Sequence, residues 1–226
     1  MIMSVIKKKI KSLYKKYLPT IYPNRCPFCR CTIPPDDFAC ESCKKDIPVH
    51  GYFQGVNGGF MCCSPLLYRG KSRRAVLNFK FRKKTQYSKH FAKLIYIQIQ
   101  KSYPDFIFDY ITYVPMYYKD ERKRGFNQSQ LLAKELSILM EIPCISTIEK
   151  IKRTQHQHHL SASKRRKNLK GAFKVIDKTT VKGKHILLID DIITTGTTLH
   201  ECSKALEKAK PSQICCATIL STAYLY

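Results

Sequence analysis

One segment near the carboxyl end of the chain, HILLIDDIITTGTT at residues 185–198, constrains the fold most strongly. Its apolar run predicts a buried strand, two carboxylates follow at the end of that strand, and a turn rich in threonine and glycine opens into a helix. In an open parallel sheet, ligands bind at the carboxyl ends of the strands, where such turns lie. The segment therefore predicts an α/β fold with a ligand site beside Asp190 and Asp191.

The rest of the chain supports a parallel sheet because predicted strands and helices alternate along it. Apolar spacing predicts helices over 71–81, 88–100, 126–140 and 197–209. Strands are expected over 64–68, 108–115, 144–148, 173–176, 185–190 and 213–221. We expect one α/β domain over residues 65–226, preceded by a glycine-rich linker or surface loop over 51–59.

The turn within the first segment has the composition of a phosphate-binding loop. Such a turn offers successive backbone N–H groups and hydroxyls to a phosphate at the positive end of the helix dipole. The candidate phosphate-binding residues are Thr194, Thr195, Gly196, Thr197 and Thr198. Two adjacent carboxylates would repel a phosphate, so we expect Asp190 and Asp191 to accept hydrogen bonds from the vicinal hydroxyls of a ribose, or to hold Mg²⁺ indirectly. An acidic strand end also occurs in nucleotide hydrolases, but the chain lacks their G-x-x-x-x-G-K-[ST] loop.

Near the amino end, two C-x-x-C pairs lie ten residues apart. They are Cys26 with Cys29 and Cys40 with Cys43. Each pair puts two thiolates on a tight turn, and two such turns can bind one tetrahedral Zn²⁺. A zinc-ribbon-like module over 25–48 is too small to bury a core, so the metal would supply its folding free energy. The alternatives are two redox dithiols, or Cys31 as a competing ligand.

The eleven cysteines also indicate a reducing compartment. Their number is odd and includes adjacent pairs at 62–63 and 215–216, which does not suit a secreted disulfide framework. The cysteines outside the module are expected as small apolar residues on loops or in the core. Because the amino terminus lacks an apolar segment followed by a small-residue cleavage site, we expect a cytoplasmic protein. No run reaches the ~18 apolar residues of a membrane span.

The chain has 41 Lys and Arg against 16 Asp and Glu, a formal net charge of +25, and this charge is unevenly spread. Residues 50–104 carry eleven basic and no acidic side chains, and residues 149–184 carry twelve against two. Such a surplus indicates nucleic acid, a polyphosphate or an acidic membrane surface as partner, or else a solvated basic face. The predicted basic amphipathic helix over 1–24 is expected to pack on its own protein, and it also suits a membrane or nucleic acid.

The segment at 185–198 resembles the signature of the phosphoribosyltransferases, which bind 5-phosphoribosyl-1-pyrophosphate (PRPP). Two further motifs narrow this resemblance. Val114-Pro115 followed by RKRGFNQ at 122–128 is similar to the V-P … R-G-F-N-Q motif of the competence protein F (ComF, or GntX) family. A second, basic motif of that family also has a counterpart in this chain. The residues that resemble it are Arg153-Thr154-Gln155, Arg165-Arg166, Asn168 and Gly171-Ala172-Phe173.

This resemblance implies a zinc-ribbon-like module followed by a type I phosphoribosyltransferase domain that binds PRPP with Mg²⁺. It also implies a link to the uptake of transforming DNA, with single-stranded DNA and other competence proteins as candidate partners. The acceptor pocket is expected between residues 65 and 100. The polar, basic stretch over 150–171 is expected to be a lid over the site or a disordered segment.

Departure of pyrophosphate from C1 of the ribose requires cations that bind more tightly as charge develops on the bridging oxygen. Basic side chains after the first strand and on the lid can supply them. The candidate catalytic residues are Arg124, Arg165 and Arg166. Asn127 is either a ligand of the pyrophosphate or base, or the N-cap of the following helix. The cluster of His156, His158 and His159 is expected to be solvated or to contact anions rather than to bind a metal.

Two functions from different classes follow. In the first, the protein is an active phosphoribosyltransferase with an unidentified acceptor, which the intact acidic pair and threonine loop favour. In the second, it is a nucleic-acid-binding competence protein that binds PRPP only as an effector, which the zinc module and the basic stretches favour. The two are compatible, because a basic face can hold single-stranded DNA while the site binds its sugar phosphate.

Overall fold

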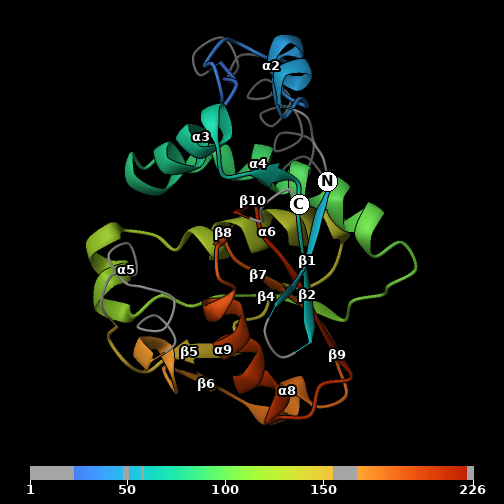
Figure 1. Cartoon of the computed structure of the whole chain (residues 1–226), viewed down its shortest axis with the longest axis vertical. Coiled ribbons are helices and arrows are strands. Elements are labelled where there is room, and N and C mark those ends of the chain that lie inside the picture. The colour runs from blue at the N-terminus through green and yellow to red at the C-terminus, as the bar shows by residue number, and fades with distance from the viewer. Residues whose placement is uncertain (1–22, 48–50, 57–58, 155–166, 223–226) are drawn as a thin grey trace, which may run out of the picture.

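The computed structural model describes residues 23–47, 51–56, 59–154 and 167–222. At its centre lies a five-stranded sheet in the order β1-β2-β9-β7-β4 (Figure 1). The edge strand β1 (Tyr52–Val56) is antiparallel to its neighbour, and the other strands are parallel to one another. Those strands are β2 (Phe60–Ser64), β9 (Gln213–Ala217), β7 (His185–Ile189) and β4 (Tyr110–Tyr113). The prediction of an α/β fold built on a parallel sheet is confirmed.

The central strands are apolar without alternation because both of their faces are covered. In β7, the four residues from Ile186 to Ile189 are all buried. Cys62 in β2 lies opposite Cys216 in β9, and both side chains are fully buried. The adjacent cysteine pairs are thus small core residues, as expected.

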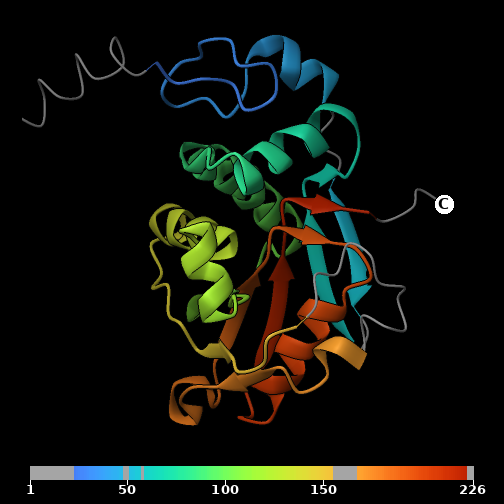
Figure 2. The same cartoon turned by 90° about the vertical axis from the view of Figure 1, so that its left-hand side faces the viewer.

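Helices cover the two faces of the sheet (Figures 1 and 2). On one face, Leu187 and Ile189 join an apolar core with α3 (Gly70–Phe81), α4 (Ser88–Ser102) and α6 (Gln128–Met140). On the other face, Ile186 and Leu188 join a second core with α9 (Thr197–Glu207). All four helices begin and end within two residues of the predicted limits.

Shorter elements surround this framework. β3 (Leu66–Leu67), β10 (Leu220–Ser221) and β8 (Ile192–Ile193) form a parallel sheet, and β5 (Ile148–Lys150) pairs with β6 (Phe173–Val175) in antiparallel fashion. The short helices are α2 (Glu41–Asp46), η1 (Thr85–Tyr87), α5 (Tyr118–Arg124) and α8 (Lys178–Val181). Figure 2 places α2 and the cysteine module at one end of the molecule, beyond α3 and α4.

The prediction of a linker or loop over 51–59 is wrong. Tyr52–Val56 forms β1, and β2 begins at Phe60, so two strands of the main sheet precede residue 65. Gly59 has φ +85°, a backbone conformation that glycine adopts without steric cost, at the connection between the strands. The glycines of this connection masked the strand beside it.

Three predicted strands are interrupted. The strand over 64–68 breaks at Pro65, between β2 and β3, and the strand over 213–221 divides into β9 and β10. Over 144–148, Cys144 makes a single bridge to Ile111, and β5 begins only at Ile148. Helix α5 was not predicted, because six of its seven residues are charged and no apolar stripe marks it.

Some sequence predictions fall outside the described residues. These are most of the amino-terminal helix over 1–24, the central part of the 150–171 stretch, and the side chains of His156, His158, His159, Arg165 and Arg166.

Candidate functional site

The segment over residues 185–198 forms a strand, a turn and the start of a helix, in the predicted order. β7 ends at Ile189, the acidic pair follows, and α9 begins at Thr197. Gly196 occupies the N-cap position with φ +69° and supplies no side-chain cap to the first-turn N–H groups. A methyl group at Gly196 would lie 3.2 Å from Cγ1 of Val56, at the end of β1. The turn therefore presents backbone donors at the positive end of a helix, and a side chain at Gly196 would crowd Val56.

The acidic pair is nearly inaccessible to solvent: Asp190 is 9% exposed and Asp191 6%. Oδ1 of Asp190 accepts hydrogen bonds from Ser129 Oγ and from the backbone N–H of Asp191, each at 2.8 Å. Lys80 Nζ lies 2.6 Å from Oδ2 of Asp191. Burial and the neighbouring charge of Asp191 raise the pKa of Asp190 to about 7. Oδ2 of Asp190 and Oδ1 of Asp191 take no part in these contacts.

Sequence analysis missed two residues of this network. Ser129 directly follows the RGFNQ motif, and its position in the first turn of α6 carries it to the end of β7. Lys80 comes from α3, far away in the sequence. In the sequence, Lys80 is one of eleven basic residues in the acid-free stretch 50–104, and no local pattern distinguishes it from the others.

The RGFNQ motif lies beside the acidic pair. Asn127 caps α6, since its Oδ1 accepts from the N–H groups of Ser129 and Gln130 and its Nδ2 donates to Val114 O. In this structure Asn127 is therefore the N-cap, one of its two predicted roles. Arg124 is held at the end of α5, where its Nη1 donates to Gln128 Oε1 at 2.9 Å. The Arg124 guanidinium also lies 5.7 Å from the ring centroid of Phe81.

Other predicted basic residues are less closely tied to this site. Arg122 and Lys123 are exposed on α5. Arg153 Nη2 contacts Asp120 Oδ1 at 3.5 Å, also near α5. Within the described residues, Arg124 is the predicted catalytic arginine whose position can be related to the acidic pair.

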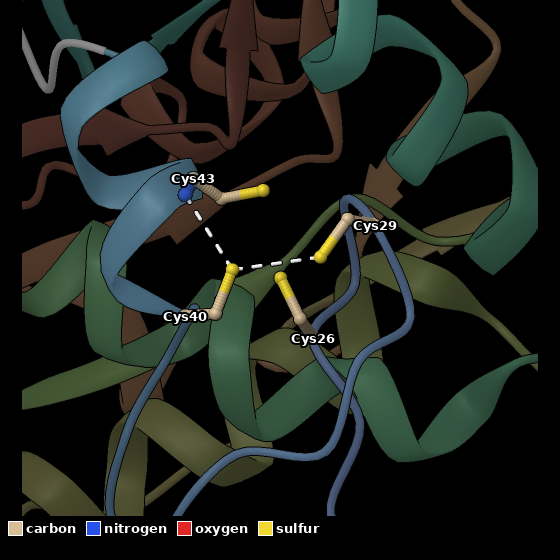
Figure 3. Close-up of side chains that lie close together, drawn as sticks. All are labelled: Cys26, Cys29, Cys40 and Cys43. Atoms are coloured by element: carbon tan, nitrogen blue, oxygen red, sulfur yellow. Dashed lines mark hydrogen bonds between the residues drawn. The ribbon is translucent and has the colours of Figure 1, made fainter.

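The four predicted zinc ligands converge. The sulfurs of Cys26, Cys29, Cys40 and Cys43 point toward one another (Figure 3), and all lie within 4.8 Å of one another. Tetrahedral Zn²⁺ with Zn–S bonds of about 2.3 Å requires sulfurs roughly 3.8 Å apart, so the cluster fits the ion after a small contraction. Cys31 lies 3.4 Å from Cys29 but is exposed and outside the group of four.

Local backbone structure positions the cysteines. Cys26 N donates to Cys31 O and Arg30 N donates to Cys26 O, which closes a tight loop around the first pair. Cys40 is the N-cap of α2, and Cys43 lies in the first turn of that helix. A backbone N–H from Cys31 lowers the pKa of Cys29 to about 6, which favours the thiolate that a metal requires.

The cysteine module packs on the helices above the sheet. The Phe28 ring contacts Phe91 of α4 edge-on, with centroids 6.4 Å apart. Nδ1 of His90 lies 3.0 Å from Asp37 O, and Lys93 Nζ donates to Asp36 O. The module is thus anchored on α4 by apolar and polar contacts.

Comparison with known proteins finds similarity over the larger part of the chain. Residues 122–223 match the family model of the phosphoribosyl transferase domain. Competence protein F of Haemophilus influenzae is 35% identical over 144 residues, which cover 62% of this chain and 63% of that protein. The chain is thus similar to competence protein F over this region. Competence protein ComFC of Bacillus subtilis is 26% identical over 212 residues, covering 82% of this chain and 85% of that protein.

A DNA utilization protein, YhgH of Salmonella typhimurium, is 40% identical over 99 residues, 43% of each chain. The chain thus spans less than two thirds of the Haemophilus and Salmonella relatives. Among solved structures, the glutamine PRPP amidotransferase from B. subtilis gives a TM-score of 0.44 at 16% identity, covering 63% of this chain and 30% of that one. The predicted resemblance to the ComF family and the phosphoribosyltransferase fold are confirmed by the family match and these relatives.

None of the helices in the described part of the chain has the length and apolarity needed to cross a bilayer.

Proposed function

We propose that the protein binds PRPP with Mg²⁺ at the carboxyl end of β7. The observation that carries this proposal is the arrangement of the acidic pair beside an uncapped helix start, inside a phosphoribosyl transferase domain. The 5′-phosphate would accept from the N–H groups of the turn over 194–198. The ribose hydroxyls would donate to the open oxygens of Asp190 and Asp191.

The same site suits transfer of the phosphoribosyl group to an acceptor. Arg124 would stabilise the negative charge that develops on the departing pyrophosphate, together with Arg165 and Arg166 of the basic stretch. Mg²⁺ bound with PRPP would neutralise further charge on the pyrophosphate. The alternative is that the site binds PRPP as an effector and performs no transfer.

Thermal unfolding with and without PRPP and Mg²⁺ tests the binding proposal. A ligand that binds only the folded state raises the melting temperature. We expect this increase in wild type and in an Asp105→Asn control, which changes an exposed acid outside the site. The double variant Asp190→Asn/Asp191→Asn should lose it. An equal increase in the double variant would refute the site assignment.

Release of pyrophosphate separates transfer from effector binding. Labelled PRPP would be incubated with the protein and with bases, ammonia or single-stranded DNA, one at a time. Release that depends on one acceptor would identify the reaction. Binding without acceptor-dependent release across this panel would favour the effector function.

We infer that the cysteine cluster holds a structural Zn²⁺. The convergence of four thiols within 4.8 Å supports this inference. Four cysteine ligands leave no open coordination position, so the ion would stabilise the module rather than take part in transfer.

We further propose that the protein handles single-stranded DNA during competence, with other competence proteins as partners and in the cytoplasm. The names of its relatives refer to competence and to DNA utilization. The supporting structural observation is an open surface hollow of about 550 Å³ along α3, lined by Arg73, Arg74 and Arg82 among others. Arginines in such a groove can bind the phosphates of a single strand.

A further inference from the structure

The ion pair between Lys80 and Asp191 differs from the other ion pairs of the described residues in its burial. Its side chains are 18% and 9% exposed, whereas each of the other pairs is more exposed at both partners. Exposed pairs contribute little to stability. A buried ion pair carries a desolvation cost, so its presence points to a role other than stabilising the fold.

Lys80 lies at the junction of three parts of the site. Its backbone carbonyl accepts a hydrogen bond from Gln128 Nε2, and Gln128 in turn accepts from Arg124. Its ammonium contacts Asp191. Yet Lys80 belongs to α3, which precedes the region of residues 122–223 that matches the phosphoribosyl transferase domain.

The charge of Lys80 acts on both carboxylates. Two adjacent acids with little solvent repel one another, and burial alone favours their neutral forms. The charge of Lys80 lowers the pKa of Asp190, against burial and the charge of Asp191, which raise it. An ionised carboxylate is a stronger acceptor for a ribose hydroxyl than the neutral acid, because its hydrogen bonds are charge-assisted and both of its oxygens accept.

The remaining surroundings of Asp190 contribute less charge. Three buried thiols interact electrostatically with Asp190: Cys62 in β2, Cys216 in β9 and Cys202 in α9. Burial raises the pKa of each thiol, so these groups stay neutral. Lys150 of β5 is a second cation that interacts electrostatically with Asp190, and burial lowers the pKa of this lysine. Among the described residues, Lys80 is therefore the principal cation that opposes protonation of Asp190.

We propose that Lys80 is a positioning residue of the PRPP site: its ammonium fixes the carboxylate of Asp191 and offsets the negative charge of the acidic pair, so that the pair can accept from the ribose diol. This inference rests on the proposed binding of PRPP. It assigns to α3 a part in substrate binding that the family match does not cover.

The test measures PRPP affinity by isothermal titration calorimetry, with Mg²⁺, between pH 6 and 9. Four proteins are compared: wild type, Lys80→Met, Lys80→Arg and Lys84→Met. Lys84 is exposed in the same basic stretch and provides the matched control. We expect Lys80→Met to move the pH midpoint of binding upward by about one unit, which is about tenfold weaker binding near neutral pH. Lys80→Arg should retain most of the wild-type profile, and Lys84→Met all of it.

Each outcome is decisive. An unchanged midpoint in Lys80→Met would overturn the role of Lys80, as would a Lys80→Arg profile that matches Lys80→Met. Absence of binding in wild type would instead refute the proposed function. In that case carboxyl ¹³C titration of Asp190 by NMR, which needs no ligand, still tests the pairing: the pKa of Asp190 should rise in Lys80→Met, and an unchanged pKa would overturn the inference.

Discussion

The carboxylate of Asp190 opposes folding at neutral and higher pH. Because its pKa is raised to about 7, the folded protein retains a proton there that the unfolded chain has already released. The stability that this proton provides is present below about pH 4 and is lost as the pH rises through about 7. A neutral side chain of the same shape would avoid this loss.

We therefore expect Asp190→Asn to raise the melting temperature clearly more at pH 8 than at pH 5. Asparagine Oδ1 can still accept the hydrogen bonds of Ser129 and the Asp191 N–H group. Thermal unfolding at both pH values would measure the effect, with Asp105→Asn as control. If Asp190→Asn were less stable than wild type at pH 8, the claim that the buried Asp190 carboxylate destabilises the fold would be contradicted.

Gly196 is the residue at which backbone conformation and space are both restrictive. An alanine at φ +69° costs about 1–2 kcal/mol in backbone strain alone. Gly183 has φ +70°, but nothing lies within 4 Å of a methyl group there. We expect Gly196→Ala to be more destabilising than Gly183→Ala, and only Gly196→Ala to weaken PRPP binding. Chemical denaturation and calorimetry would measure the two effects, and equal losses in both variants would argue against the crowding by Val56.

At the scale of elements, the cysteine module can be tested with two neighbouring cysteines. Cys40→Ser removes one of the four converging thiols, whereas Cys31→Ser changes an exposed thiol outside the group. We expect wild type and Cys31→Ser to bind about one Zn²⁺ per chain. Cys40→Ser should lose the metal and have a lower melting temperature, because the module contacts α4 through Phe28 and Phe91.

Metal analysis and thermal unfolding with and without a chelator would check this prediction. If Cys31→Ser lost the metal and Cys40→Ser retained it, Cys31 rather than Cys40 would be the fourth ligand. A chelator that leaves the melting temperature of wild type unchanged would show that the module folds without a metal.

The long helices and the β7 segment were predictable because their signals are local. A stripe of apolar residues marks α6, and four successive apolar residues followed by two acids mark β7. β1 was missed because the glycines around it are typical of a turn, and its pairing with β2 is the evidence that it is a strand. Lys80 was missed because its partner lies 111 residues away, at the end of another element. Local pattern predicts elements, whereas such a contact depends on tertiary packing.

At the scale of the whole molecule, the net charge of +25 exceeds what one small ligand requires. If the excess on α3 binds single-stranded DNA, the binding must weaken steeply with salt, because each phosphate contact releases a counterion. We expect Arg73→Gln/Arg74→Gln to reduce both the affinity and the salt dependence measured by fluorescence anisotropy. Lys178→Gln, on the opposite end of the molecule, is the control (Figure 1). Flat salt dependence, or no binding at low salt, would remove DNA from the proposed partners.

The central claim is that the acidic pair and the turn over 194–198 form a PRPP site, and titration calorimetry of PRPP with Mg²⁺ into the full chain at pH 8 tests it most directly. At that pH the Asp190 carboxyl is largely ionised. We predict saturable binding with one site per chain in wild type and in Asp105→Asn, and no detectable heat in Asp190→Asn/Asp191→Asn. Undiminished binding in the double variant, or none in wild type, would contradict the account.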